Sequence, residues 1–184
     1  MNAEPFDGVL AAAQAGAEWA LSVLYRKLHP QVLSYLLARE PSEGEDLASE
    51  VWLDVASGLN RFAGDEAGFR AWVFTIARRR LVDLHRKAMV RKASPATTNT
   101  LRGDRGVGDV EKEALATLGT TAALALIASL PPDQADVVLL RVVGDLSVAD
   151  VATILGKRPG AVRALQHRAL RNLARMFSEE AVTE

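Results

Sequence analysis

The sequence contains no cysteine, which excludes disulfide bridges, thiolate-bound zinc and cysteine nucleophiles. Its three histidines, His29, His85 and His167, lie far apart and show no metal-ligand spacing. Aromatic residues make up only 5% of the 184 residues, whereas alanine and leucine are abundant, which favours helices over sheets. No apolar run reaches the roughly 18 residues of a membrane span, and Glu4 and Asp7 stand where a secretory signal would be basic. We therefore expect a soluble, cytoplasmic protein without a metal or other cofactor.

The net charge of −1 conceals a strong segregation of charge along the chain. Six acidic residues and no basic residue lie between Glu40 and Asp54, whereas seven basic residues and one acid lie between Arg78 and Lys92. A further six basic residues and no acid lie in 157–175. Separate blocks of opposite sign predict partners of both signs, namely a polyanion for the basic faces and a basic surface for the acidic face.

The hydrophobic spacing indicates helices throughout the chain, with no sustained alternation of the kind that strands show. Three glycines between Gly58 and Gly68 predict a loop, and the Ser-, Pro-, Thr- and Gly-rich stretch before Val110 predicts a linker. The fold class is therefore all-α, with two small helical domains, 1–90 and 111–184, joined by a flexible linker over 91–110. The expected helices cover 14–39, with a break or kink at Pro30, then 45–57, 69–87, 111–129, 133–143, 148–155 and 159–177.

A helix-turn-helix unit is predicted near the C-terminus. Ser147 can cap a short helix, and Asp150, three residues later, favours the positive end of that helix. Gly156 can supply the left-handed residue that ends the short helix, and Pro159 suits the first position of the next one. A short helix, a tight turn and a longer helix are the arrangement of a DNA-reading unit.

The longer helix of this unit has one apolar face and one basic face. Rotation by about 100° per residue places Arg163, His167 and Arg171 opposite the apolar positions, with Arg168 at the edge. Arginine can donate two hydrogen bonds to a guanine in the major groove, while flanking basic residues contact phosphates. The alternative is a basic face that is merely solvated, but the capped short helix and the absence of acids favour DNA reading. The apolar positions are Val162, Leu165, Ala169, Leu173 and Met176.

The first domain carries an acidic line in which Asp46, Glu50 and Asp54 recur once per helical turn. Ser42 and Glu45 stand at capping-box spacing at the start of this helix. Carboxylates one turn apart repel each other by about a few tenths of a kcal/mol, so the line suits a basic partner, although a solvated face is the alternative. With no metal partner and no acid–base pair in contrasting environments, these carboxylates do not indicate catalysis.

The helix that begins near Phe69 combines aromatic and basic residues. Arg78, Arg79 and Arg86 are predicted on its outer side, and Trp72 at core spacing is predicted to pack rather than stack. Phe62 lies in the glycine-containing loop and is the better candidate for a base contact. Aromatic and basic residues together suit single-stranded nucleic acid, because bases stack on rings while cations neutralise the backbone.

These residues resemble the bacterial sigma-70 family. Asp46-Leu47-Ala48-Ser49-Glu50-Val51-Trp52, and then Phe69-Arg70-Ala71-Trp72-Val73-Phe74-Thr75-Ile76-Ala77-Arg78-Arg79 with Asp83 and Arg86, look like region 2 of that family. Leu130-Pro131, Val138-Leu139-Leu140-Arg141 and the unit 146–173 resemble region 4. Two regions in this order, a short linker and no middle domain are similar to the extracytoplasmic function (group IV) class.

The resemblance implies a transcription initiation factor that directs core RNA polymerase to promoters and helps to open them. Its implied partners are the β and β′ subunits of core polymerase, promoter DNA and an anti-sigma factor. The implied contacts with core polymerase are Asp46, Glu50 and Asp54. The implied contacts with the −10 element are Asn60, Arg61, Phe62, Arg78, Arg79 and Arg86. The implied contacts with the −35 element are Arg158, Arg163, His167, Arg168 and Arg171.

Two other functions are compatible with parts of the sequence. One is an ordinary helix-turn-helix regulator that binds duplex DNA without being a polymerase subunit. The other is a helical adaptor whose charged faces bind only proteins. An enzyme is the least supported class, since no nucleophile–base pair, phosphate loop or metal set is present.

Overall fold

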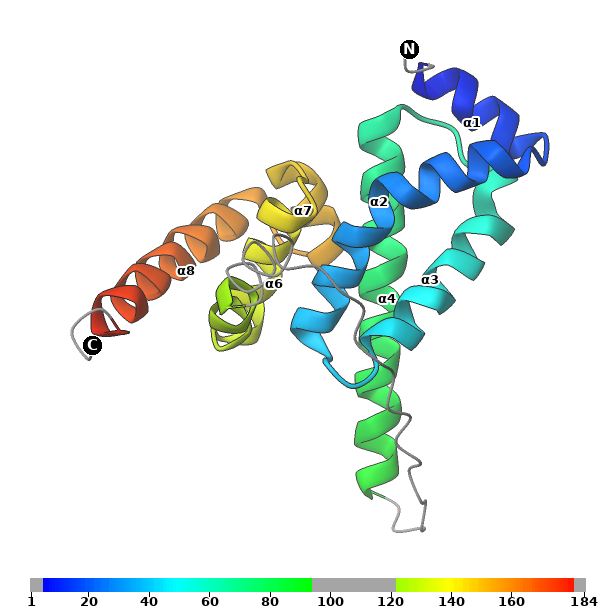
Figure 1. Ribbon diagram of the computed structural model, residues 1–184. Coiled ribbons are helices and arrows are strands. Elements are labelled where there is room, and N and C mark those ends of the chain that lie inside the picture. The colour runs from blue at the N-terminus through cyan, green and yellow to red at the C-terminus, as the bar shows by residue number, and fades with distance from the viewer. Residues whose placement is uncertain (1–4, 94–121, 181–184) are drawn as a thin grey trace, which may run out of the picture.

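The computed structural model describes residues 5–93 and 122–180, and both parts are helical without any strand (Figure 1). This confirms the all-α class. The predicted linker from residue 94 onward, and the first part of the helix predicted over 111–129, lie outside the described residues. The first part comprises α1 (Phe6–Gln14), α2 (Glu18–Arg39), α3 (Gly44–Gly58), the short 3-10 helix η1 (Leu59–Arg61) and α4 (Glu66–Ala93). The second comprises a helical turn over 122–128, α6 (Pro132–Val138), the π-helix η2 (Leu139–Val143), α7 (Val148–Leu155) and α8 (Pro159–Glu180).

Helices α2, α3 and α4 enclose the core of the first domain. Leu47, Val51 and Val55 of α3 recur at the helical period and are buried. Phe74 and Leu81 of α4 are also fully buried. Helix α4 is therefore more deeply enclosed than an amphipathic helix on a domain surface, because two helices pack against it from different sides.

Several boundaries in the first domain differ from the predictions. The helix expected over 14–39 is divided between the end of α1 and α2, and α4 spans Glu66–Ala93 instead of 69–87, so residues 91–93 of the predicted linker are helical. Helix α2 continues through Pro30, so the proline does not break it. Helix α3 begins at Gly44 after a turn, and its N-cap Glu43 makes no side-chain capping bond. The capping box expected from Ser42 and Glu45 is therefore wrong, because the turn places the first helical residue two positions after Ser42.

The second domain packs directly against the first. Val137, Leu139 and Leu140 are buried in the same apolar cluster as the core of α2 and α4. Gly144, at the end of η2, allows this approach, since a Cβ atom there would lie 2.7 Å from the Leu140 carbonyl oxygen and 3.3 Å from the Phe74 ring. The two domains thus share an apolar core to which the start of α8 contributes Val162, and α8 then extends away from the first domain (Figure 1).

The helix-turn-helix unit has the predicted local structure. Ser147 accepts a hydrogen bond from the Asp150 backbone N–H, and the Asp150 carboxylate accepts one from the Ser147 N–H, which forms a reciprocal capping box. Gly156 ends α7 with φ 61°, the left-handed conformation that glycine adopts at little cost. Pro159 then opens α8. These caps fix the angle at which α8 leaves the turn.

Candidate nucleic-acid interface

The outer face of α8 is exposed and basic. Arg163, His167 and Arg171 are all exposed, and Arg168 lies exposed at the edge of this face. The opposite face is held by Val162 and Ala169, which are fully buried. Apolar burial on one side therefore orients the arginines towards solvent, as the helical period predicts.

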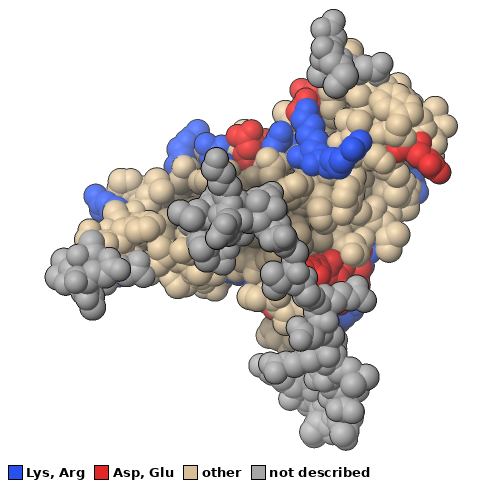
Figure 2. Space-filling model, in the orientation of Figure 1, with Lys and Arg blue, Asp and Glu red and all other residues tan. Residues whose placement is uncertain are grey.

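These α8 arginines have no acidic partner among the residues that the structure describes. The Arg168 guanidinium contacts only its own helix, at 3.4 Å from the Ala164 carbonyl oxygen. Lys157, in the preceding turn, is instead paired with Asp133 of α6 at 2.9 Å. Figure 2 shows lysine and arginine side chains along the upper edge of the second domain. Within residues 5–93 and 122–180, Arg163, Arg168 and Arg171 can therefore bind a polyanion without first breaking an ion pair.

The charged residues of α4 are arranged differently. Arg78, predicted to contact DNA, is turned towards the second domain, where its Nη2 lies 3.0 Å from Oδ2 of Asp136. Asp136 also lies 3.0 Å from Nε of Arg39, and its side chain is only 2% exposed. One buried carboxylate of α6 thus bridges arginines of α2 and α4. We define this set, Arg39, Arg78 and Asp136, as the interdomain triad.

The interdomain triad is incompletely hydrogen-bonded. Asp136 Oδ1 and Arg39 Nε are buried and close, but they do not make an aligned hydrogen bond. The buried Tyr35 hydroxyl lies beside them. Burial raises the pKa of Asp136 despite the two arginines, and burial likewise raises the pKa of Tyr35. Desolvation of these groups partly offsets the attraction that holds the domains together.

The acidic line of α3 meets bases from its own chain. Arg80 donates to both carboxylate oxygens of Asp54, at 2.6 and 2.7 Å, and to Glu50 at 2.9 Å. Arg79 adds a longer contact to Asp54 at 3.3 Å. The hydrogen bond from Arg80 lowers the pKa of Asp54 below its usual value. Asp54 is thus a paired carboxylate, whereas Asp46 at the other end of the line is exposed.

Phe62 lies in an aromatic cluster rather than free in the loop. Its ring stacks on Trp72 at 5.2 Å between centroids and meets Phe69 edge-on at 5.4 Å. Trp72 is half-buried and packs as predicted. Asn60 and Arg61, immediately before Phe62, are exposed. A base contact by Phe62 stays a prediction, and it requires either the uncovered part of the ring or its release from the cluster.

Arg86 lies more than one helical turn beyond Arg80 and is exposed, whereas its neighbour His85 contacts Glu40 of the first domain. Near the middle of α4, Arg78 contacts Asp136 of α6, whereas Arg79 and Arg80 contact Asp54 of α3. Arg86 lies apart from all three, towards the end of α4. Within residues 5–93 and 122–180 no cluster of three or more His, Asp or Glu side chains could hold a metal ion. In the same part of the chain no helix is long and apolar enough to cross a bilayer.

Three residues at these surfaces were not singled out from the sequence. Asp136 and Arg80 each form ion pairs with residues far away in the sequence. Helical periodicity shows on which face a charged residue lies, but it does not show which distant residue will be its partner. Gln14, predicted only as the start of a helix, donates from its side-chain amide to the carbonyl oxygens of Leu59 and Phe62. Nothing in the sequence around Gln14 indicates that its side chain bonds to residues 59 and 62.

Comparison with known proteins identifies the family. The Sigma-70 region 2 family model matches residues 24–90, and the Sigma-70, region 4 model matches residues 120–173. The chain is 34% identical to the ECF RNA polymerase sigma factor SigD of Mycobacterium tuberculosis over 179 residues, which cover 94% of this chain and 84% of SigD. The chain belongs to the ECF group of the sigma-70 family. The matches to both regions do not favour the alternative of a regulator that acts without polymerase.

A second relative agrees with this ECF sigma factor assignment, and a solved structure shares the fold. The chain is 34% identical over 171 residues to the ECF RNA polymerase sigma factor BldN of Streptomyces coelicolor, covering 92% of this chain and 64% of the length of BldN. Its fold is similar to that of the sigma factor RpoE of Bartonella quintana, solved in complex with the anti-sigma factor NepR, with a TM-score of 0.63. The alignment covers 85% of this chain and 96% of RpoE at 18% identity, so this likeness concerns the fold alone.

Proposed function

We propose that this sigma factor binds core RNA polymerase, directs it to specific promoters and helps to open them. In this proposal residues 1–90 bind polymerase and open the −10 element, 91–110 are the linker, and 111–184 read the −35 element. The observation that carries the proposal is the basic face of α8, which is exposed, free of acids and held out by a capped helix-turn-helix. No catalytic role belongs to it, and its place of action is the cytoplasm.

For the −35 element, α8 would enter the major groove of duplex DNA. Arg163 and His167 lie one turn apart on the exposed face, and the small exposed residues Gly160 and Ala164, each next to this line, leave room for close approach. Arg158, Arg168 and Arg171 flank this line and suit phosphate contacts. One such unit buries too little surface for tight binding alone, so the second domain needs the polymerase to hold it on the promoter.

For the −10 element, Asn60, Arg61 and the outer arginines of α4 would contact the separated strand. Arg78 can join them only after the second domain releases it, because Asp136 occupies its guanidinium. The proposed docking of α3 on core polymerase rests mainly on Asp46, since Arg80 donates to both carboxylate oxygens of Asp54 and to Glu50. An arginine or lysine from polymerase would otherwise have to displace Arg80.

An anti-sigma factor is a further proposed partner. The resemblance implies one, and the relative RpoE was solved with the anti-sigma factor NepR. Two unlike charged faces, acidic on α3 and basic on α8, would give such a protein complementary surfaces on both domains.

The test is transcription in vitro with core polymerase and a pool of genomic promoter fragments. The expected result is a restricted set of transcripts with a shared pair of sequence elements, obtained only when both proteins are present. The same transcripts from core polymerase alone, or none from the mixture, would contradict the proposal. The Arg163→Ala and Asp133→Ala proteins form a matched pair, because only the first change touches the proposed DNA face.

A further inference from the structure

The segment between α3 and α4 is hydrogen-bonded to a residue near the start of the chain. Gln14, the last residue of α1, donates from Nε2 to the carbonyl oxygen of Leu59 at 2.9 Å and to that of Phe62 at 2.8 Å. The Leu59 oxygen also accepts the Phe62 backbone N–H at 3.0 Å. The backbone on either side of Asn60 and Arg61 is thus tied to one side-chain amide.

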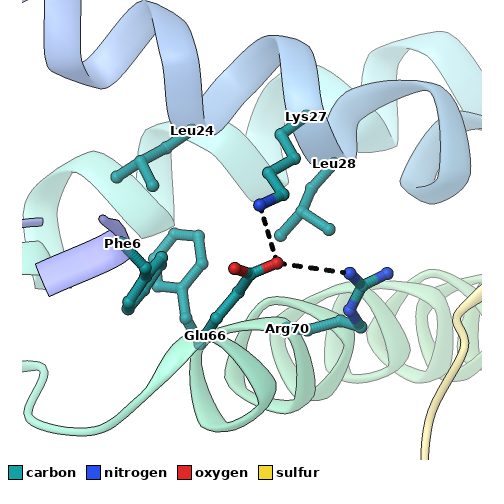
Figure 3. Close-up of a pocket in the computed structure, with 7 residues that line it drawn as sticks. Phe6, Leu24, Lys27, Leu28, Glu66 and Arg70 are labelled. Carbon is teal, nitrogen blue, oxygen red and sulfur yellow. Dashed lines mark ion pairs between the residues drawn. The ribbon is translucent and has the colours of Figure 1, made fainter. Parts of the chain in front are cut away.

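Helix α1 is a firm support for this amide. Val9, Leu10 and Ala13 are buried, and the Phe6 ring packs against Phe69 with centroids 5.8 Å apart. Figure 3 shows Phe6 facing Leu24 and Leu28 across a small pocket at the other end of α1.

An ion-pair network beside this pocket ties α2 to the start of α4. There Glu66 bridges Lys27, at 2.7 Å, and Arg70, at 3.8 Å (Figure 3). None of these three charged residues belongs to α1, so the position of Gln14 depends on the apolar contacts of α1 itself, namely the buried Val9, Leu10 and Ala13 and the Phe6–Phe69 contact.

Gln14 and the aromatic cluster act on different atoms of the loop. The Phe62 ring is held by Trp72 and Phe69, whereas Gln14 holds the carbonyl groups of the backbone. Asn60 and Arg61 lie between the two held carbonyls and are both exposed. Their side chains therefore start from a defined backbone although they have no packing of their own.

We propose that Gln14 is a positioning residue for promoter opening, which sets the backbone of 59–62 so that Asn60 and Arg61 meet the separated −10 strand. This inference rests on the proposed function, and Gln14 itself touches no DNA. Only a residue with two adjacent N–H donors fulfils this role, since both acceptors are carbonyl oxygens. A carboxylate at the same position would be repelled by both carbonyl oxygens, because it has no N–H or O–H group to donate.

Two substitutions separate this role from simple packing. Gln14→Met keeps the length of the side chain and removes both donors, while Gln14→Glu keeps the shape and replaces attraction with repulsion. Ala11→Glu is the matched control, because it adds the same charge to an exposed position of the same helix. Any effect of a negative charge near the end of α1 then appears in the control as well.

The assay is promoter opening by holoenzyme, read by permanganate reactivity of thymines on a template that the wild-type protein opens. We expect Gln14→Met to lower the opening rate about tenfold, as expected for two lost neutral hydrogen bonds, and Gln14→Glu to lower it further. Capture of core polymerase should be unchanged, and the yield of run-off transcript from a template with a pre-melted −10 bubble should be close to that of the wild-type protein. In a library of randomised −10 elements, the variants should lose preference at one or two positions.

Opening by Gln14→Glu at the wild-type rate would overturn the proposal. Equal losses on duplex and bubble templates, or a uniform loss of output without a change in base preference, would also overturn it, because they indicate a merely structural role. If the wild-type holoenzyme itself opens no member of the library, the proposed function fails and this inference fails with it. Wild-type opening with unaffected Gln14 variants refutes the role of Gln14 alone.

Discussion

Removal of the Asp136 carboxylate should separate the two domains. In Asp136→Ala, Arg39 and Arg78 would stay largely buried in the packed arrangement, with side chains 12% and 22% exposed, but without a counter-charge. When the domains separate, both arginines become hydrated, so the substitution destabilises only the packed arrangement. Removing one partner of a buried ion pair typically costs about 3–5 kcal/mol.

The imperfect geometry of the interdomain triad favours the lower end of that range. Asp136 Oδ1 makes no aligned hydrogen bond, and desolvation already raises the pKa of this carboxyl. A change of about 3 kcal/mol shifts the equilibrium between packed and separated domains roughly 100-fold. Replacing both charged partners, as in Asp136→Leu with Arg78→Met, should recover part of this loss, because no charge of that pair is then left unpaired.

The absence of native cysteine makes the measurement simple. Single cysteines at the exposed positions Ala56 of α3 and Ala174 of α8 can carry a donor and an acceptor dye. Energy transfer should fall in Asp136→Ala but not in Asp133→Ala, whose 2.9 Å pair with Lys157 lies within the second domain and is partly exposed. Wild-type energy transfer in Asp136→Ala, with unchanged helix content, would refute the reasoning.

Three further predictions concern the proposed interfaces. Asp46→Lys with Glu50→Lys should weaken capture of core polymerase at moderate salt while the domain stays folded; unchanged capture would remove α3 from the docking surface. Arg163→Ala should cost about 1–3 kcal/mol and relax base preference at one −35 position, whereas Arg168→Ala should weaken binding to all sequences and flatten the salt dependence; insensitivity to both would place the reading face elsewhere. Because Arg80 lowers the pKa of Asp54, the stability that this ion pair supplies is present at neutral pH and is lost as the pH falls below about 4. Asp54→Asn should therefore flatten the acid limb of a plot of melting temperature against pH, and identical acid limbs would contradict the pairing.

The second domain was largely predictable from sequence because its signals are local. Ser147, Asp150 and Gly156 act within a few residues of one another, and the helical period separates Val162 from Arg163. Each of these features follows from backbone geometry that any chain obeys, and the structure reproduces all of them.

The first domain was less predictable, because its charged residues find partners far along the chain. The acidic line of α3 suggested a basic partner, and the structure supplies one from α4, with Arg80 and Asp54 separated by 26 positions. Arg78 had the pattern of an outward base but pairs with Asp136 of the other domain. Helical periodicity predicts which side chains leave the core, but it does not predict which of them then meet.

We expect this chain to open promoter DNA only together with core polymerase. Permanganate reactivity on linear promoter duplex, measured with the chain alone, core polymerase alone and the two combined, tests this expectation. Reactive thymines within the −10 element should appear only in the combined sample. Reactivity with the chain alone, or an unreactive duplex in all three samples on promoters that the combined proteins bind, would contradict it.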